Sequence, residues 1–170
     1  MISIYDSKEI QAVVLSLKRA SSELRKEIYK RTREQVLPEW RDAIATELGQ
    51  GPNAVLGARL ILMNTRVKIG QQELNLQAAT KGTKTTSGGL IPQDYYYLAE
   101  FGAAPRVAEI SGRRGNTRYN YKRKINTWSQ GRVKHGRFAY KAAGNIGYRA
   151  IALWVASTVQ IFTEAARSPR

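Results

Sequence analysis

Residues 66–79, with the sequence RVKIGQQELNLQAA, decide the fold class of this 170-residue chain. Apolar and polar residues alternate on both sides of the central Gly70-Gln71-Gln72 segment. Alternation with a period of two is typical of β-strands, and a short glycine-containing connection between two such runs predicts a β-hairpin. The segments before and after this stretch show helical spacing instead. The sequence therefore predicts an α+β fold with a small antiparallel sheet between helical parts.

The segment before the hairpin, residues 6–48, forms a helical N-terminal part in this prediction. Asp6 and Glu9 make a capping pattern, and apolar residues then recur every three or four positions as far as Val36. This spacing predicts one long helix. Pro38 lacks a backbone N–H and its ring clashes with the preceding turn, so we expect the helix to kink or restart there.

The central segment, residues 53–140, is expected to be rich in β-structure. Residues 80–89 consist of Thr, Lys, Gly and Ser and predict a loop. Residues 112–137 mix Arg and Lys with Gly, Asn and Tyr, and contain strand-like runs at 118–122 and 132–140. We interpret residues 112–137 as an extended basic hairpin that projects from the body, and call it the predicted basic arm.

The last segment, residues 142–167, returns to helical spacing and predicts a C-terminal helix packed on the sheet and on the long first helix. No internal repeat divides the chain, and its length suits one domain over residues 1–170. Six large apolar residues are expected in the core of this domain: Leu17, Leu24, Phe101, Ile151, Trp154 and Phe162.

Positive charge is concentrated in one part of the sequence. The chain has 28 Lys and Arg against 13 Asp and Glu, which gives a formal net charge of +15. Residues 110–163 alone carry eleven basic side chains and no acidic one. A charge excess of this size predicts an acidic partner, either nucleic acid or the acidic surface of a protein.

The residue types that many catalytic sites require are scarce. The chain has no Cys, which excludes disulfides, thiolate nucleophiles and Cys-ligated zinc, and its single His excludes a multi-histidine metal site. His135 lies among cations with no carboxylate near it in the sequence. Glu100 stands in an apolar setting, and we expect an ion pair with Arg59 or Arg149 rather than a role in acid catalysis. The sequence thus predicts a protein that is not an enzyme and holds no metal or cofactor.

No membrane segment or signal peptide is expected. The longest strongly apolar stretch, residues 151–162, is interrupted by polar residues and is shorter than the roughly 20 residues that span a bilayer. Residues 1–6 lack a basic region followed by an apolar one.

The candidate contact residues are the cations of the predicted basic arm, which are interleaved with Tyr119, Tyr121 and Trp128. Cations and aromatic rings together suit phosphate contacts and base stacking. Arg side chains also bind carboxylates bidentately, and we favour an acidic neighbouring protein, against which the arm becomes ordered. The sequence leaves both partners open, and it lacks the motifs of sequence-specific readout. The candidate residues are Arg113, Arg114, Arg118, Lys122, Arg123, Lys124, Arg132, Lys134 and Arg137.

Two further stretches resemble a known family. Residues 87–92 (SGGLIP) and 95–103 (YYYLAEFGA) are similar to the Tyr-x-x-x-x-Glu-Phe-Gly-(Thr/Ala) signature of tailed-phage neck and tail-completion proteins. Residues 136–143 (GRFAYKAA), followed by a helix with LWV at 153–155, resemble the closing segment of that family. The predicted N-terminal helix and the strands after it follow in the same order, so the resemblance covers nearly the whole chain.

The resemblance implies a structural virion protein that forms a ring, usually sixfold, between the capsid portal and the tail tube. Its partners would be identical subunits, neighbouring neck proteins, the tail tube or tail terminator, and the genomic double-stranded DNA in the channel. It would reside in the neck or tail of the virion, and in the host cytoplasm during assembly. The alternative is a stand-alone, sequence-independent nucleic-acid-binding protein, which would stay small where a ring-forming subunit would build a large oligomer.

The Glu-Phe-Gly motif itself is interpreted as a structural corner. Phe101 can anchor a turn in the core, Gly102 can let the backbone reverse, and Glu100 can hold a basic side chain. A ring of identical subunits needs head-to-tail contacts between different surfaces. A long helix and an extended arm are suitable for reaching adjacent subunits.

Overall fold

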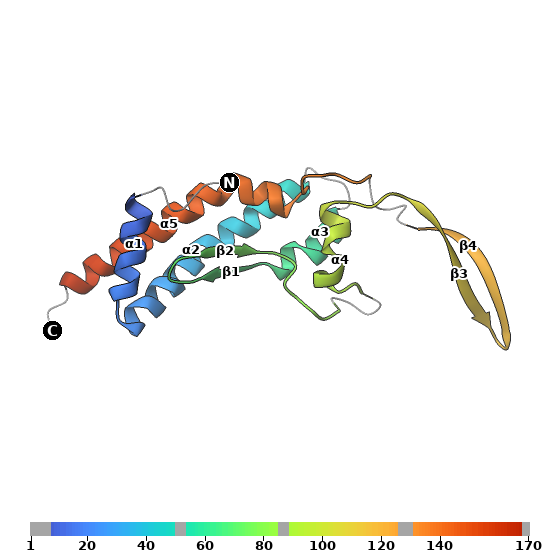
Figure 1. Ribbon diagram of the computed structural model, residues 1–170, viewed down its shortest axis with the longest axis horizontal. Coiled ribbons are helices and arrows are strands. Elements are labelled where there is room, and N and C mark those ends of the chain that lie inside the picture. The colour runs from blue at the N-terminus through green and yellow to red at the C-terminus, as the bar shows by residue number, and fades with distance from the viewer. Residues whose placement is uncertain (1–7, 50–53, 85–88, 126–130, 168–170) are drawn as a thin grey trace.

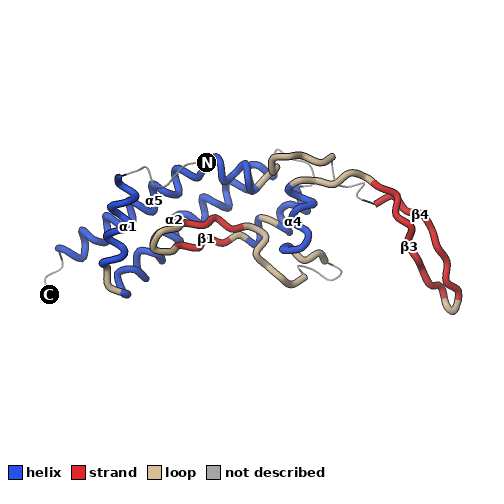
Figure 2. The backbone as a smooth tube through the Cα atoms, viewed as in Figure 1, coloured by secondary structure: helices blue, strands red, loops and turns tan. Residues whose placement is uncertain are grey.

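The computed structural model describes residues 8–49, 54–84, 89–125 and 131–167. A helical body and a hairpin that extends away from it make up the molecule (Figure 1). Figure 2 shows that helices dominate the body, whereas the projecting part consists of strands. The elements are α1 (Lys8–Arg19), α2 (Ser22–Gly49), α3 (Ala54–Leu60), the 3₁₀ helix η2 (Leu62–Asn64), β1 (Arg66–Ile69), β2 (Leu74–Gln77), α4 (Pro92–Glu100), β3 (Arg106–Arg114), β4 (Thr117–Ile125) and α5 (Ala139–Arg167).

The expected α+β class is confirmed. The described strands form two separate two-stranded antiparallel sheets, β1–β2 and β3–β4. The hairpin predicted from residues 66–79 is present, with Arg66 paired to Gln77 and Ile69 to Leu74. The central segment is less rich in strands than predicted, because α3, η2 and α4 also lie in it. Residues 80–84 of the predicted loop are neither helix nor strand, and residues 85–88 lie outside the described residues.

The two longest helices, α2 and α5, pack side by side and run antiparallel along the body (Figure 1). With 28 and 29 residues, each is roughly 42–44 Å long. Near one end of the pair, Arg31 Nη1 lies 3.1 Å from Glu164 Oε1, and near the other, Lys141 Nζ lies 2.6 Å from Glu47 Oε2. The hydrogen bond from Arg31 holds the pKa of the Glu164 carboxyl below its ordinary value. One ion pair therefore bridges the two helices near each end of the pair.

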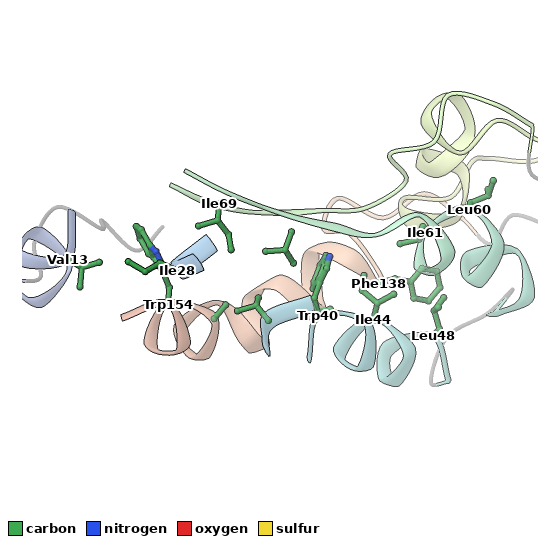
Figure 3. Close-up of a cluster of buried hydrophobic side chains, with 14 of the residues drawn as sticks. Val13, Ile28, Trp40, Ile44, Leu48, Leu60, Ile61, Ile69, Phe138 and Trp154 are labelled. Atoms are coloured by element: carbon green, nitrogen blue, oxygen red, sulfur yellow. The ribbon is translucent and has the colours of Figure 1, made fainter. Parts of the chain in front are cut away.

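The core lies along this helix pair and extends to the β1–β2 hairpin (Figure 3). The buried residues of α2 recur at intervals of four, which places them on one helix face. Trp40 Nε1 donates a hydrogen bond to the Gln77 carbonyl oxygen at 3.1 Å, so α2 is tied directly to β2. The largest buried apolar side chains of the two helices are Ile28, Val36, Trp40, Ile44 and Leu48 on α2 and Trp154 and Ile161 on α5.

The predicted core is confirmed for Leu17 and Trp154, which are fully buried. The other four expected core residues, Leu24, Phe101, Ile151 and Phe162, are only half-buried. The buried face of α5 runs through Ala150, Trp154, Ser157, Thr158 and Ile161. Positions 151 and 162 lie beside this face, because it is narrower than the apolar stripe in the sequence.

The final helix packs mainly on α2, which confirms the predicted packing on the long N-terminal helical part, whereas the packing on the sheet that was also predicted is not among its main contacts. α2 contacts both α5 and β1, and α1 contacts α5. The β1–β2 hairpin has Val67 and Ile69 buried, whereas β2 is half-buried. A four-residue strand offers too little apolar surface to cover a helix of 29 residues, so another long helix covers it.

The N-terminal helix breaks earlier than the sequence predicted. α1 ends at Arg19, and Ser21 Oγ then accepts a hydrogen bond from the Leu24 backbone N–H at 3.3 Å. A serine oxygen in this position satisfies one of the free N–H groups at the start of a helix, which makes Ser21 the cap of α2. The expected single helix over this region is therefore two helices.

α2 does not restart at Pro38, which was one of the two outcomes that the sequence predicted there. The helix continues through it to Gly49, and Pro38 lies on the exposed side. Val36 and Trp40 on either side are buried against the core. Most helix stability in proteins comes from the packing of an apolar face, and here that packing outweighs the local cost of proline.

Candidate functional site

The candidate contact residues lie largely on the β3–β4 hairpin, which we call the arm. Its two nine-residue strands pair from Arg106 with Ile125 to Arg114 with Thr117, which leaves Gly115 and Asn116 as a two-residue turn. Gly115 has a φ of +58°, the left-handed value that a type II′ turn requires at its first central position. Two-residue turns of this type match the twist of the strands, so glycine here determines where the arm turns. The arm extends away from the helical body (Figure 1).

The arm spans residues 106–125 and not 112–137 as predicted. Arg113, Arg114, Arg118, Lys122, Arg123 and Lys124 lie on it, whereas Arg132, Lys134 and Arg137 precede α5. Residues 132–138 form no strand, and Trp128 lies outside the described residues. The backbone N–H groups of Val133 and Arg137 donate instead to the carbonyl oxygens of Phe101 and Glu100, at 2.8 and 3.0 Å. These bonds tie this segment to the Glu-Phe-Gly corner and so keep it out of the hairpin.

The prediction missed the first half of β3, including Arg106. The signal was in the sequence, because Ala108, Ile110 and Gly112 alternate with more polar residues before a Gly-Asn turn. Counting back from that turn gives the observed strand.

The register divides the side chains of the arm into two faces, because successive residues of a strand point to opposite sides. One face, which we call the apolar face, has Ala108, Ile110, Gly112, Tyr119 and Tyr121 at its centre, and it also carries Arg106, Arg114, Thr117, Arg123 and Ile125. The other, which we call the polar face, is formed by Val107, Glu109, Ser111, Arg113, Arg118, Asn120, Lys122 and Lys124.

The apolar face is packed within the hairpin but covered by no other described element. The rings of Tyr119 and Tyr121 stack with centroids 5.7 Å apart. Tyr119 lies over Gly112, where a Cβ would approach its Cζ to 2.7 Å. Despite this packing, Tyr119 and Tyr121 remain 46% and 39% exposed. Because position 112 is a glycine, the Tyr119 ring can lie directly against the backbone there.

The polar face carries four cations and one carboxylate, that of Glu109, which lies directly opposite Lys122. Arg113 and Arg118 lie directly opposite each other across the strands. Arg113 donates from Nε to the Gly115 carbonyl oxygen at 3.0 Å and from Nη2 to Asn116 Oδ1 at 3.3 Å, which holds its guanidinium at the tip. None of the seven Arg and Lys residues between positions 106 and 125 forms an ion pair with a described residue.

The Glu-Phe-Gly corner joins the arm to the body through Glu100. This residue ends α4, and its side chain is completely buried. The carboxylate accepts hydrogen bonds from three consecutive backbone N–H groups at the start of α5, those of Phe138 at 3.2 Å and of Ala139 and Tyr140 at 3.0 Å each. The first N–H groups of a helix have no partner within it and carry partial positive charge. Glu100 is therefore a cap for α5 supplied by a distant part of the chain.

The expected ion pair of Glu100 with Arg59 or Arg149 is wrong. Arg149 pairs with Glu39 on α2, and Glu100 forms no ion pair with a described residue. The three backbone N–H groups take the place of the expected cation. Sequence spacing does not reveal such a partner, because every residue has a backbone N–H.

The other two residues of the motif form the turn that leads from α4 toward β3. Gly102 has a φ of +72°, so the backbone reverses there as expected. Phe101 is half-buried and contacts Tyr140, with ring centroids 5.4 Å apart, so it packs on α5 and is not part of the buried core. Close packing continues at Gly136, where a Cβ would overlap the Glu100 carboxylate.

No cluster of metal-ligating residues is found in the part of the chain that the structure describes. The described residues include no group of three or more His, Cys, Asp and Glu that could hold a metal ion. His135 is exposed. A cavity of about 320 Å³ lies beside Glu100, but the carboxylate is occupied by its three backbone donors. The described helices include none that is long and apolar enough to cross a membrane.

The arm and the corner are therefore the features on which a function can be proposed. Comparisons of the chain with protein-family models, with curated proteins and with solved structures gave no match.

Proposed function

We propose that the protein is a structural subunit of a tailed-phage neck, a head-to-tail connector or tail-completion protein. In this proposal identical subunits form a ring between the portal and the tail tube, around the channel through which the DNA passes. The residues that carry the resemblance support the proposal: residues 95–103 and 136–143 meet at the corner, where Glu100 caps α5. The two segments that carry the resemblance are far apart in the sequence, and together they build one structural feature, the corner.

The observation that carries the assembly part of the proposal is the exposed apolar face of the arm. A two-stranded hairpin that packs on nothing else is at best marginally stable in water. Tyr119, Tyr121 and Ile110 together present an apolar surface that the body of the same subunit leaves open. Covering this face would stabilise the arm and remove apolar surface from water.

A second copy of the chain is the occupant that the proposal assigns to this face. The arm extends beyond the body, so it reaches a neighbour more readily than its own helices (Figure 2). The surface that receives the arm differs from the arm itself, which makes the contact heterologous. Contacts of this kind close into rings when the rotation between subunits permits.

The test is the oligomeric state of the purified chain. Sedimentation velocity over a concentration series, with negative-stain images of the largest species, should show a closed ring of one stoichiometry. The double variant Tyr119→Ser with Tyr121→Ser should sediment as a monomer, because it removes the aromatic part of the apolar face. The matched control is Met63→Ser with Tyr148→Ser, two exposed apolar residues of the body, which should leave the ring intact.

A wild-type chain that stays monomeric at every concentration would contradict the ring. It would leave the stand-alone nucleic-acid-binding protein as the function to pursue. A ring that survives the loss of both tyrosines would show that the arm is not its main contact.

A further inference from the structure

We infer that the polar face of the arm binds the phosphate backbone of double-stranded DNA without sequence preference. The inference deepens the proposed function and rests on it for the position of the arm beside a DNA channel. Its physical basis is the charge and shape of the arm, which can be tested on the free protein.

An excess of positive charge is the first argument. Residues 106–125 carry seven Arg and Lys and a single acidic residue, Glu109. The polar face holds Glu109 and four of these cations, Arg113, Arg118, Lys122 and Lys124, whereas Arg106, Arg114 and Arg123 lie on the apolar face. Same-face residues along one strand recur about every 6.8 Å, so the charge extends along the ribbon and is not confined to one point. An extended row of cations matches an extended polyanion.

The tip of the arm gives the second argument. Arg113 and Arg118 are directly opposite each other, and like charges in this position destabilise a strand pair. Hydrogen bonds to Gly115 and Asn116 nevertheless hold the Arg113 guanidinium at the turn. A phosphate between the two guanidinium groups would turn this repulsion into attraction, with charge-assisted hydrogen bonds from both.

The shape of the arm fits a DNA groove. The major groove of B-DNA is roughly 12 Å wide and admits a two-stranded β-ribbon. Nine residues at about 3.4 Å each give a ribbon of roughly 30 Å, close to one turn of the double helix. The arm can therefore follow one groove for about a turn and meet phosphates along it.

The absence of sequence preference follows from the polar side chains between the cations. Asn120 is the residue on this face best suited to read adenine, but its Oδ1 accepts a hydrogen bond from Ser111 Oγ at 2.7 Å. That bond occupies one half of the amide that a bidentate base contact would need. The remaining contacts from Arg and Lys favour phosphates, which carry no sequence information.

A second copy of the chain is a poor partner for the polar face. Glu39, Glu47 and Glu164 already form ion pairs within the body, and Glu100 is buried as the cap of α5. The remaining acidic residues of α1 and α2 are interleaved with Lys and Arg, and α4 adds only Asp94. The sequence had favoured an acidic protein neighbour for the arm. With the two faces separated, the aromatic centre of the apolar face suits a neighbouring subunit, and the polar face, with Arg113 and Arg118 at its tip, suits DNA.

The experiment measures binding of short fluorescein-labelled duplexes of two unrelated sequences by fluorescence anisotropy, over a series of salt concentrations. Both duplexes should bind equally, with affinity that falls steeply as salt rises. Arg113→Gln with Arg118→Gln should weaken binding at least tenfold and reduce the slope of log affinity against log salt by about 2, since two phosphate contacts are lost.

Two further double variants distinguish DNA binding by the polar face from a general effect of the net charge. Lys122→Gln with Lys124→Gln should weaken binding in the same way, and neither residue takes part in the hydrogen bonds of the turn. The charge-matched control is Lys26→Gln with Lys30→Gln on the exposed side of α2, which should change the affinity much less.

Three results would overturn the inference: no duplex binding by the wild-type chain at low salt, equal losses in the control and the arm variants, or binding of polyglutamate as tight as that of duplex. Sedimentation of the same samples distinguishes a failure of this inference from a failure of the proposed function. A ring without duplex binding contradicts this inference alone. Duplex binding that depends on Arg113 and Arg118, in a chain that forms no ring, contradicts the proposed function alone.

Discussion

Glu100 is the residue at which the sequence and the structure differ most instructively. A carboxylate among apolar residues is conspicuous in the sequence, which marks Glu100 for attention. Its role as the cap of α5 depends on backbone groups 38 to 40 positions away. The corner therefore fastens the end of α4 to the start of α5, on either side of the arm.

Replacing the carboxylate with an amide tests this role. In Glu100→Gln one side-chain oxygen becomes an NH₂ group, which faces a backbone N–H and cannot accept its hydrogen bond. Because the group is buried, we expect the free energy of unfolding to fall by about 1–3 kcal/mol. Urea unfolding followed by circular dichroism measures the change. Glu73→Gln, at an exposed position, is the control, and equal stability of the two variants would argue against the cap.

At the scale of elements, the helix pair α2–α5 determines the shape of the body. Trp154 lies fully buried on α5, and its Nε1 has no hydrogen-bond partner among the described residues. Its contribution should therefore come from packing and not from a polar contact. The buried indole belongs to the same core cluster as Ile28 and Trp40 of α2 (Figure 3).

Trp154→Ala should lower the free energy of unfolding by about 3–5 kcal/mol, enough to make the chain insoluble or unable to assemble. Trp154→Phe should cost much less, since a large ring remains and no hydrogen bond is lost. Thermal unfolding of the two variants provides the comparison. Equal destabilisation by alanine and phenylalanine would show that the indole N–H has a role that the packing does not explain.

At the scale of the whole molecule, the arm and the body are energetically separate. The side chains of the buried core come from the helices, from β1 and from Phe138 just before α5. No residue of β3 or β4 belongs to this core. The main contacts of β3 and β4 are with each other. The body should therefore fold without the arm, and the arm should serve contacts outside the subunit.

Replacing residues 107–124 with a short Gly-Ser linker should leave the thermal midpoint of the body nearly unchanged, because no core contact is removed. The same variant should lose ring formation and duplex binding together. Far-UV circular dichroism against temperature measures the first effect, and sedimentation and anisotropy measure the second. A body that unfolds without the arm would mean that the hairpin supports the core.

The sequence by itself determined the features that depend on neighbours along the chain. The alternation around Gly70 predicted the β1–β2 hairpin, and the helical spacing from residue 142 predicted α5, because both patterns arise from the local geometry of strands and helices. The concentration of positive charge was equally visible. The exact extent of the arm could have been predicted from its Gly115-Asn116 turn. The charge pattern instead placed the start of the arm at residue 112, whereas β3 begins at residue 106.

Only the tertiary structure decided the features that depend on distant residues. The backbone partners of Glu100, the continuation of α2 through Pro38 and the packing of α5 mainly on α2 all result from contacts between segments far apart in the chain. A local pattern states which residues prefer burial, but the partner that buries them is chosen by the packing of the whole chain. For the same reason the arm was recognisable from its charge, whereas its separation into an apolar and a polar face required the register of two paired strands.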